Sequence, residues 1–407
     1  MLITQYFPPE VGAAQTRLHA VTQELVRRGD EVDVVTAVPN YPLGAVFPEF
    51  RRKLSVHSIE QGVRVHRVWM YPAMGTGVKR LISYASFSAS SLWGLCRARR
   101  PDVVVVESPP LFVAVPALLY GALIRRPVVV NVADLWPDAA VAVGAVSDGR
   151  ILRAMFALER WVYRRARAVG TVTEGVRDTL LNDKRLPPEK IVLLPNGVDT
   201  VQFSPDIVPG TILVELAVPD RPFVVYAGTM GLAHGLDPLF DAMGVLKAAT
   251  DTPLLLMIGA GSERDRLEQR AADEGLTNVL FRDPVPPTDL ARLLPLAVAG
   301  VVTLAEIPLN EKSRPAKLFP LMAAGLPILF TGGGEGADAV RTADAGIVVP
   351  NTADAIAAGM RDICDPAKRA VWGENSRRAV ETRWSWRQQI DAWHHTLRGL
   401  VDRERTS

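Results

Sequence analysis

Short runs of β-branched and other apolar residues alternate along this chain with longer segments in which apolar residues recur at helical spacing. This alternation predicts successive βα units and a mainly parallel sheet, so we expect an α/β fold. Several runs are apolar without interruption, which is typical of strands covered on both faces. The strands expected in the first half are Met1–Tyr6, Glu31–Ala37, Val63–Trp69, Val103–Glu107, Val128–Val132, Ala168–Val172 and Ile191–Leu194.

The second half repeats this pattern, which predicts two doubly wound domains. Its expected strands are Phe223–Ala227, Leu254–Ile258, Asn278–Phe281, Gly300–Leu304, Pro327–Phe330 and Gly346–Val349. A stretch rich in proline and glycine, residues 195–222, predicts the connection between the domains. The segment 367–405 is helical in pattern and carries four tryptophans, with which a terminal helix could pack across the first domain. We therefore place the domains at 1–205 and 206–384, followed by the terminal helix at 385–407.

The composition excludes some classes of function. The 407 residues include 46 Lys and Arg against 44 Asp and Glu, and this near balance gives no net field that would attract nucleic acid. Cys96 and Cys364 are far apart and show no metal-ligand spacing, so we expect a reducing cytoplasm. The first residues lack the pattern of an export signal.

Two segments bear on membranes. The longest apolar stretch, 111–124, is interrupted by Pro116 and falls short of the roughly 20 residues that a spanning helix needs. The segment 78–100 has basic ends and an apolar middle. It could lie on an anionic membrane at the inner face, as a peripheral contact, or it could simply be a helix packed on the sheet.

Ligands of doubly wound sheets bind at the carboxyl ends of the strands, so the loops that follow the strands are the candidate sites. The loop after the first strand contains Gly12 and Ala13 and precedes a helix, whose start can bind phosphate. A glycine required only by a tight turn is the alternative. After the strand 128–132, Asp134 and Trp136 could face a ligand, and the alternative role for Asp134 is a helix cap.

The loops of the second half contain more glycine. Gly228, Thr229 and His234 lie in one loop, where we expect ligand contact. The loop 259–264, which includes Gly261, nearly matches a dinucleotide fingerprint, but Arg264 occupies the third glycine position, which argues against nicotinamide chemistry. No P-loop occurs, which disfavours kinases and ATPases.

Two cations precede the short apolar segment 318–323. Arg314 and Lys317 lie where a helix start favours an anion, so phosphate or diphosphate is the expected ligand. Charges that merely face solvent are the alternative. The loops contain no Asp-x-Asp pair and no cluster of histidines and carboxylates, so we expect no metal.

Six motifs in order resemble the retaining glycosyltransferases of the GT-B fold, family 4, and most closely the branch of bacterial amino-sugar transferases. They are Gln5–Glu10 with Gly12, Asp134–Pro137, Leu194–Asp199, Tyr226–Asp237, Ile258–Gly261, and Lys317–Phe319 with Met322–Gly325. The resemblance covers nearly the whole chain.

The resemblance implies two Rossmann-like domains facing a central cleft. It implies transfer of a sugar, in that branch an N-acetylamino sugar linked to UDP, to a lipid-linked saccharide or a small natural product, with the anomeric configuration retained and no metal or other cofactor. Asp134 and Lys317 would be catalytic, with Asp134 and Trp136 at the acceptor. The implied donor contacts are Gly12, Ala13, Gly228, Thr229, His234, Gly261, Arg282, Val285, Arg314, Lys317 and Leu318.

The chain departs from the family pattern at several positions. Lys312 and Pro320 stand where the family carries two glutamates, the second of which grips the ribose of the donor. Thr229 and His234 stand where an arginine and a lysine are usual. A catalytically weakened sugar-nucleotide-binding protein is therefore an alternative function, and a nucleotide-sugar epimerase is another.

Overall fold

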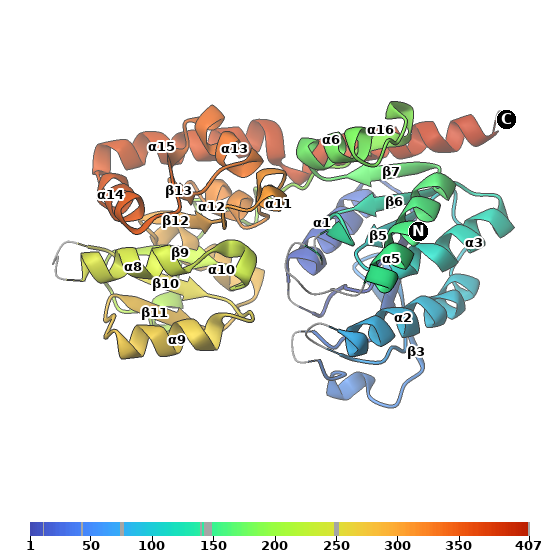
Figure 1. Cartoon of the computed structure of the whole chain (residues 1–407), viewed down its shortest axis with the longest axis horizontal. Coiled ribbons are helices and arrows are strands. Elements are labelled where there is room, and N and C mark those ends of the chain that lie inside the picture. The colour runs from blue at the N-terminus through green and yellow to red at the C-terminus, as the bar shows by residue number, and fades with distance from the viewer. Residues whose placement is uncertain are drawn as a thin grey trace. The chain divides into compact units, whose positions relative to one another are not determined.

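The computed structural model describes residues 1–10, 12–41, 44–73, 77–138, 141, 149–247 and 252–405. The chain forms two compact units (Figure 1). Unit 1 comprises Met1–Asn196 and Arg387–Ser407, and unit 2 comprises Gly197–Trp386. The boundaries expected after residues 205 and 384 both lie inside unit 2.

Unit 1 is built on an eight-stranded sheet with the order β3-β4-β2-β1-β5-β6-β7-β8. Neighbouring strands are parallel except for β3 and β4. The chain runs from β1 through β2 to the edge strand β3, turns back into β4, and then crosses to the other side of β1, so the strand order reverses between β1 and β5. The strands are β1 (Leu2–Ile3), β2 (Asp33–Ala37), β3 (Ser55–Glu60), β4 (Val63–Val68), β5 (Val104–Ser108), β6 (Val128–Val132), β7 (Ala168–Thr171) and β8 (Ile191–Leu193).

Strand β3 is not among the strands expected from the sequence. Its residues alternate between exposed and half-buried, so it lacks the buried apolar run that marks the other strands. The signal that could have revealed it is the pair Gln61-Gly62, both with positive φ, which forms the tight turn of the β3–β4 hairpin.

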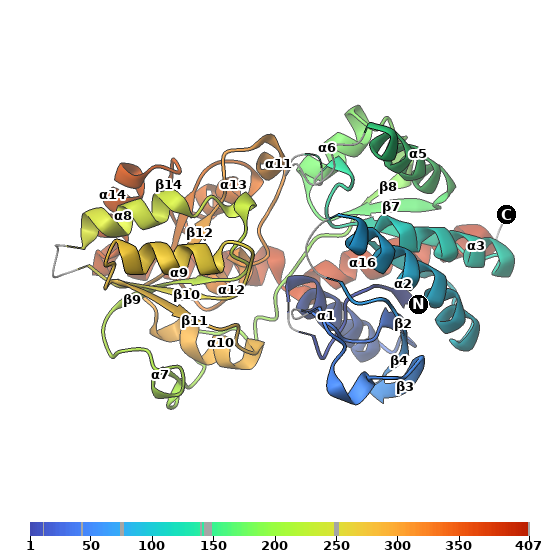
Figure 2. The same ribbon diagram turned by 60° about the horizontal axis from the view of Figure 1, so that its bottom comes forward.

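One face of this sheet is covered by helices whose apolar residues form a single core with the strands. The helices of unit 1 are α1 (Ala13–Arg27), α2 (Val78–Arg97), α3 (Ala114–Ile124), α5 (Gly149–Arg165), α6 (Glu174–Asn182) and α16 (Trp386–Arg405). Helix α2 buries Phe87 and Leu95 and runs beside α3 (Figure 2). Helix α16 belongs to unit 1 almost entirely, as expected for a terminal helix that packs on the first domain, and Arg28 at the end of α1 donates to Asp391 on it at 2.5 Å.

Unit 2 is built on a parallel six-stranded sheet with the order β11-β10-β9-β12-β13-β14. The strands are β9 (Phe223–Ala227), β10 (Leu254–Ile258), β11 (Val279–Arg282), β12 (Ala299–Thr303), β13 (Ile328–Thr331) and β14 (Gly346–Val349), each within one residue of its expected range. The strand order reverses between β9 and β12. The α/β fold class is thereby confirmed in both units.

Two separate apolar cores cover the two faces of this sheet. The helices of unit 2 are α7 (Ile212–Glu215), α8 (Asp237–Leu246), α9 (Arg264–Asp273), α10 (Pro287–Leu293), α11 (Pro308–Glu311), α12 (Leu318–Ala323), α13 (Glu335–Ala343), α14 (Ala353–Ile363) and α15 (Pro366–Ala379). A π-helical turn at Val380–Trp384 separates α15 from α16, so the helical segment 367–405 is interrupted. Within the described residues, no helix is both long and apolar enough to cross a membrane.

Candidate functional site

The loops of unit 2 that follow β9 and β10 lie beside the point where the strand order reverses, which is the usual ligand position in such sheets. The two loops are joined through the main chain, because Gly228 N donates to Ile258 O at 2.9 Å and Met230 N donates to Ala260 O at 2.9 Å. A Cβ atom on Gly261 would lie 2.0 Å from the Met230 carbonyl oxygen. Packing of the loops therefore requires this glycine, and its contact with a donor stays a prediction.

Lys317 immediately precedes α12 and reaches back to the end of β9. Its Nζ donates to the Tyr226 hydroxyl, lies 3.9 Å from the centre of the Tyr226 ring, and is 3.5 Å from the Thr229 carbonyl oxygen. Gly228 admits the lysine stem, since a Cβ atom there would lie 2.9 Å from Lys317 Cε. Tyr226 was not expected from the sequence to position this lysine, although a tyrosine near the end of a buried strand is a signal that could have suggested it.

The surroundings of Lys317 are unusual for a cation. Its neighbours are a hydroxyl and a carbonyl group, and no carboxylate among the described residues forms an ion pair with it. Burial lowers the pKa of Lys317 well below its usual range. A ligand anion would supply the missing counter-charge.

His234 lies in the same loop as Thr229, and two amide side chains hold that loop. Asn310 Nδ2 donates to Ala233 O at 2.7 Å, and Asn351 Nδ2 donates to Gly235 O at 3.0 Å. The His234 ring packs edge-on against Tyr226, with ring centres 6.3 Å apart. Burial, followed by the charge of Lys317, lowers the pKa of His234 to about 3, so the imidazole is neutral at ordinary pH.

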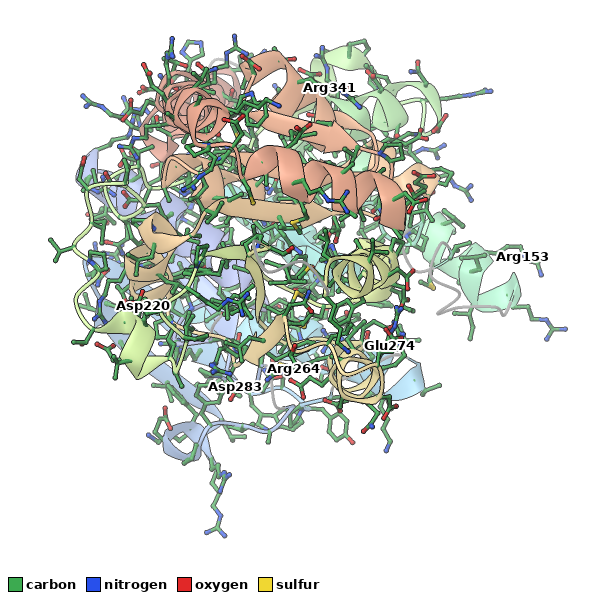
Figure 3. The ribbon with its side chains drawn as sticks, turned by 90° about the vertical axis from the view of Figure 1, so that its left-hand side faces the viewer. Arg153, Asp220, Arg264, Glu274, Asp283 and Arg341 are labelled. Carbon is green, nitrogen blue, oxygen red and sulfur yellow. The ribbon has the colours of Figure 1, made fainter. Side chains whose placement is uncertain are left out.

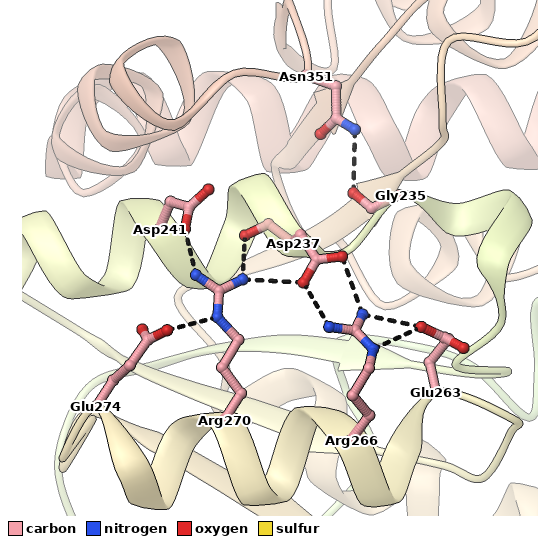
Figure 4. Close-up of polar contacts among 8 residues, drawn as sticks. All are labelled: Gly235, Asp237, Asp241, Glu263, Arg266, Arg270, Glu274 and Asn351. Carbon is pink, nitrogen blue, oxygen red and sulfur yellow. Dashed lines mark hydrogen bonds and ion pairs between the residues drawn. The ribbon is translucent and has the colours of Figure 1, made fainter.

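An ion-pair network fixes the far end of this loop (Figure 4). Asp237, the first residue of α8, accepts two hydrogen bonds of 2.9 Å from Arg266 and one of 2.9 Å from Arg270, both on α9. Such exposed pairs contribute little stability individually, but the paired geometry orients α8 against α9. The loop that carries His234 is therefore held at both ends.

Two expected donor contacts near α12, Arg314 and Leu318, have different surroundings. Arg314 lies 3.4 Å from Glu335 and stacks on Phe319 and Trp384, so a carboxylate already offsets its charge. The side chain of Leu318 is fully buried in the core, and its N–H donates to Pro315 O at 3.0 Å. The side chain of Leu318 therefore faces the core, and a contact between this residue and a donor stays a prediction. Helix α12 has only six residues, so its start adds little to the field at Lys317.

Two further expected donor contacts, Arg282 and Val285, lie at the end of β11 and in the loop that follows it. The Arg282 guanidinium donates to the main-chain carbonyls of Leu216, Ala217 and Phe281, so it serves as an internal brace. Val285 packs against the apolar core. These contacts explain the placement of both side chains within unit 2, and contact of Arg282 and Val285 with a donor stays a prediction.

Arg264, at the third glycine position of the fingerprint-like loop, has a structural role. It donates to Gly259 O at 2.9 Å and pairs with Asp283 at 2.6 Å, which joins the ends of β10 and β11 (Figure 3). The loop is closed by this arginine where a dinucleotide-binding loop would have a glycine.

In unit 1, Asp134 follows β6 in a bend of the chain, with its side chain exposed. No described residue forms a hydrogen bond or an ion pair with Asp134. Trp136 is half-buried and packs edge-on against Phe112, with ring centres 5.8 Å apart. Part of the helix that Asp134 was expected to cap lies outside the described residues. The catalytic role of Asp134 stays a prediction.

Near Asp134 lies a buried polar network that was not expected from the sequence. Arg17 on α1 forms an ion pair with Glu107 at the end of β5, and both side chains are less than a tenth exposed. Asn131 on β6 donates to Glu107 at 3.0 Å, and Arg17 donates to Asn196 at 3.4 Å. A carboxylate that follows four valines was the available signal.

The loop after β1 is also fixed from within the protein. Glu10 is buried and accepts from the N–H groups of Asn40 and Tyr41 at 2.7 and 2.8 Å, and burial raises its pKa. Gly12 precedes α1, which has no side-chain cap and no acidic residue in its first turn. Ala13 is the first residue of this helix. The start of α1 remains suited to an anion.

Family models match both units. Residues 12–197 match the glycosyl transferase 4-like domain, and residues 213–379 match the glycosyl transferases group 1.

Known proteins match over nearly the whole chain. The putative colanic acid biosynthesis glycosyl transferase WcaI of Escherichia coli K12 is 26% identical, covering 95% of this chain and 97% of its own. The GDP-mannose-dependent alpha-(1-6)-phosphatidylinositol monomannoside mannosyltransferase of Mycolicibacterium smegmatis is 24% identical, and the match covers 95% of this chain and 95% of that protein. Among solved structures, Anabaena Alr3699/HepE in complex with UDP and glucose has a TM-score of 0.70 at 17% identity, covering 97% of this chain and 98% of its own. The chain belongs to the GT-B glycosyltransferases, with a glycosyl transferase 4-like domain followed by a group 1 domain.

Proposed function

We propose that unit 2 binds the diphosphate of a sugar nucleotide at Lys317 and that the enzyme transfers the sugar. The observation that carries this proposal is the half-buried Lys317 cation, which meets only a hydroxyl and a carbonyl group among the described residues. A diphosphate would pair with it where negative charge develops on the leaving group, which is the electrostatic contribution expected of a transferase. Arg314 would assist, weakened by its contact with Glu335.

The donor we propose is UDP-linked and carries an N-acetylamino sugar. The motif resemblance supports this assignment, and the HepE complex contains UDP. The mycobacterial relative is named for its use of GDP-mannose, so guanosine is the competing base.

The acceptor would bind in unit 1 near Asp134 and Trp136. A lipid-linked saccharide is the first choice and a small natural product is the second. The exposed face of α2 supports a peripheral membrane contact, because Ile82, Leu92 and Trp93 are 49, 44 and 54% exposed and Arg97 stacks on Trp93 at 4.2 Å.

We propose that the transfer retains the anomeric configuration and needs no metal. Lys317 would stabilise the departing diphosphate, and a phosphate oxygen of the leaving group would take the proton of the acceptor hydroxyl. Neutral His234 would serve as a hydrogen-bonding neighbour, because its lowered pKa prevents it from adding positive charge.

A thermal-shift panel of nucleoside diphosphates and sugar nucleotides tests the donor, and mass spectrometry of products with candidate acceptors tests the transfer. We expect uridine diphosphate to raise the melting temperature most, and a sugar nucleotide to give a glycosylated product. Stabilisation without product for any acceptor would favour the weakened binding protein, in which Pro320 leaves the ribose without a carboxylate. An absence of stabilisation by every diphosphate would refute the proposal.

A further inference from the structure

Unit 1 contains a cavity at the opposite end of its sheet from Asp134. The cavity has a volume of about 610 Å³ and lies where β6, β7 and β8 begin and where α3 and α5 end. This volume is within the range of roughly 300 to 1,000 Å³ that small-molecule sites occupy. Nothing in the proposed glycosyl transfer uses this end of the sheet.

The lining of this cavity, hereafter the basal cavity, is strongly cationic. Its charged lining residues are Arg125, Arg126, Arg165, Arg167, Lys190 and Glu189. Five cations therefore face one carboxylate, in a chain whose formal net charge is only +2. The carboxyl ends of α3 and α5 each contribute about half a negative charge, so a net charge of about +3 remains.

The contacts of these cations leave most of that charge uncompensated. No carboxylate in the described part of the chain pairs with Arg125, Arg165 or Arg167. Arg126 lies 3.6 Å from Asp102, and its Nε is buried without an acceptor among the described residues. Lys190 donates to a carbonyl oxygen, that of Arg164, at 2.6 Å, and burial and the nearby charge of Arg167 lower its pKa.

The cavity also offers an apolar wall. Trp161 is half-buried and Leu119 is 57% exposed, and both line the basal cavity beside the cations. A flat or apolar part of a ligand could lie on these side chains while an anionic group meets the arginines.

We propose that the basal cavity binds a phosphate ester, through its cations, at a site separate from the donor site at Lys317. Arginine at several positions around one cavity suits phosphate, because its planar fork forms paired hydrogen bonds with phosphate oxygens. The same chemistry fits a free phosphorylated metabolite and the headgroup of an anionic phospholipid. If the arginines only offset the negative carboxyl ends of α3 and α5, the cavity would bind neither a phosphorylated metabolite nor a phospholipid headgroup.

The test compares Arg165→Gln/Arg167→Gln with the matched variant Arg153→Gln/Arg160→Gln. All four side chains are exposed, and both variants remove two cations in the region of α5, but only the first pair lines the cavity. The probes are inorganic pyrophosphate, measured by calorimetry, and phosphatidylglycerol vesicles, measured by co-sedimentation. Lys317→Ala in the full chain identifies the heat that belongs to the donor site.

We expect the cavity variant to weaken binding of at least one probe by about tenfold, since charge-assisted contacts of this kind are individually strong. The matched variant and Lys317→Ala should leave that binding in place. Loss of the pyrophosphate heat that does not belong to the donor site, with vesicle binding intact, would identify a free phosphate ligand, and loss of vesicle binding would identify a lipid headgroup. Unchanged binding of both probes by a folded cavity variant, or equal loss in the matched variant, would overturn the proposal.

Discussion

The two units place charge at equivalent positions, beside the reversal of strand order in each sheet, but they treat it differently. In unit 1, Arg17 and Glu107 are buried and paired with each other, and Asn131 satisfies the second oxygen of the carboxylate. In unit 2, Lys317 meets only a hydroxyl and a carbonyl group among the described residues. The Arg17–Glu107 pair is thus neutralised within unit 1, whereas Lys317 has no carboxylate partner among the described residues of unit 2, which is why we propose that it binds an anionic ligand.

The physical reason is the cost of removing ions from water. A buried pair balances this cost internally, so losing one partner leaves an uncompensated charge. A buried cation without a counter-ion is unfavourable, and the lowered pKa of Lys317 is the consequence of that cost. Binding of an anion would remove it.

The largest expected effect is on stability in unit 1. Arg17→Met leaves the Glu107 carboxylate buried without its cation and should lower the free energy of unfolding by about 3 to 5 kcal/mol. Denaturant unfolding of the two proteins measures this change. Arg17→Met/Glu107→Leu should recover most of it, and a single variant as stable as the wild type would show that the pair is not structural.

Asp134 is a charged residue of unit 1 that, unlike Glu107, has no ion-pair partner among the described residues. Asp134→Asn retains the shape of the side chain but removes its charge, and turnover should fall by about a hundredfold if the carboxylate orients the acceptor or stabilises charge on the sugar. Donor affinity should barely change. Because Asn is an equally good helix cap, near-normal turnover in a folded variant would leave only a capping role.

The pH dependence of donor binding tests the cause of the pKa shift. Only protonated Lys317 pairs with diphosphate, and burial holds its pKa well below the ordinary lysine value, so diphosphate affinity should fall as the pH rises through this lowered pKa. At pH values below the pKa of Lys317 the amine is already protonated, so diphosphate binding should take up fewer protons there than at higher pH. Lys317→Arg stays charged and should show no such decline, whereas the same decline in this variant would assign it to another group.

The smallest expected effect is that of chelation. If protein cations stabilise the leaving diphosphate, turnover with excess chelator should equal turnover without it. A loss of activity that magnesium or manganese restores would transfer that role from Lys317 to a metal.

Much of the fold could be predicted because burial on both faces requires continuous apolar strands. Runs such as Val128–Val132 and Leu254–Ile258 match the structure residue for residue. Strand β3 could not be predicted in this way, since it lies at the sheet edge with exposed side chains. β1 is shorter than expected because regular pairing ends after Ile3.

The site could be predicted only in part. The position of Lys317 at the start of a short helix follows from the sequence, but its contact with Tyr226 joins residues 91 positions apart. The Arg17–Glu107 pair spans 90 positions. Leu318 adjoins Lys317 in the sequence, but its side chain is buried in the core, and sequence proximity alone does not reveal this difference.

Calorimetric titration of uridine diphosphate into the wild type, Lys317→Ala and Lys368→Ala tests the central claim most directly. Lys368 is an exposed lysine of unit 2 that pairs with Asp362 at 3.0 Å, so it controls for the loss of one positive charge. We predict that Lys317→Ala weakens binding by about tenfold or more and that Lys368→Ala leaves it unchanged. Equal affinity in all three folded proteins would contradict the assignment of the donor diphosphate to Lys317.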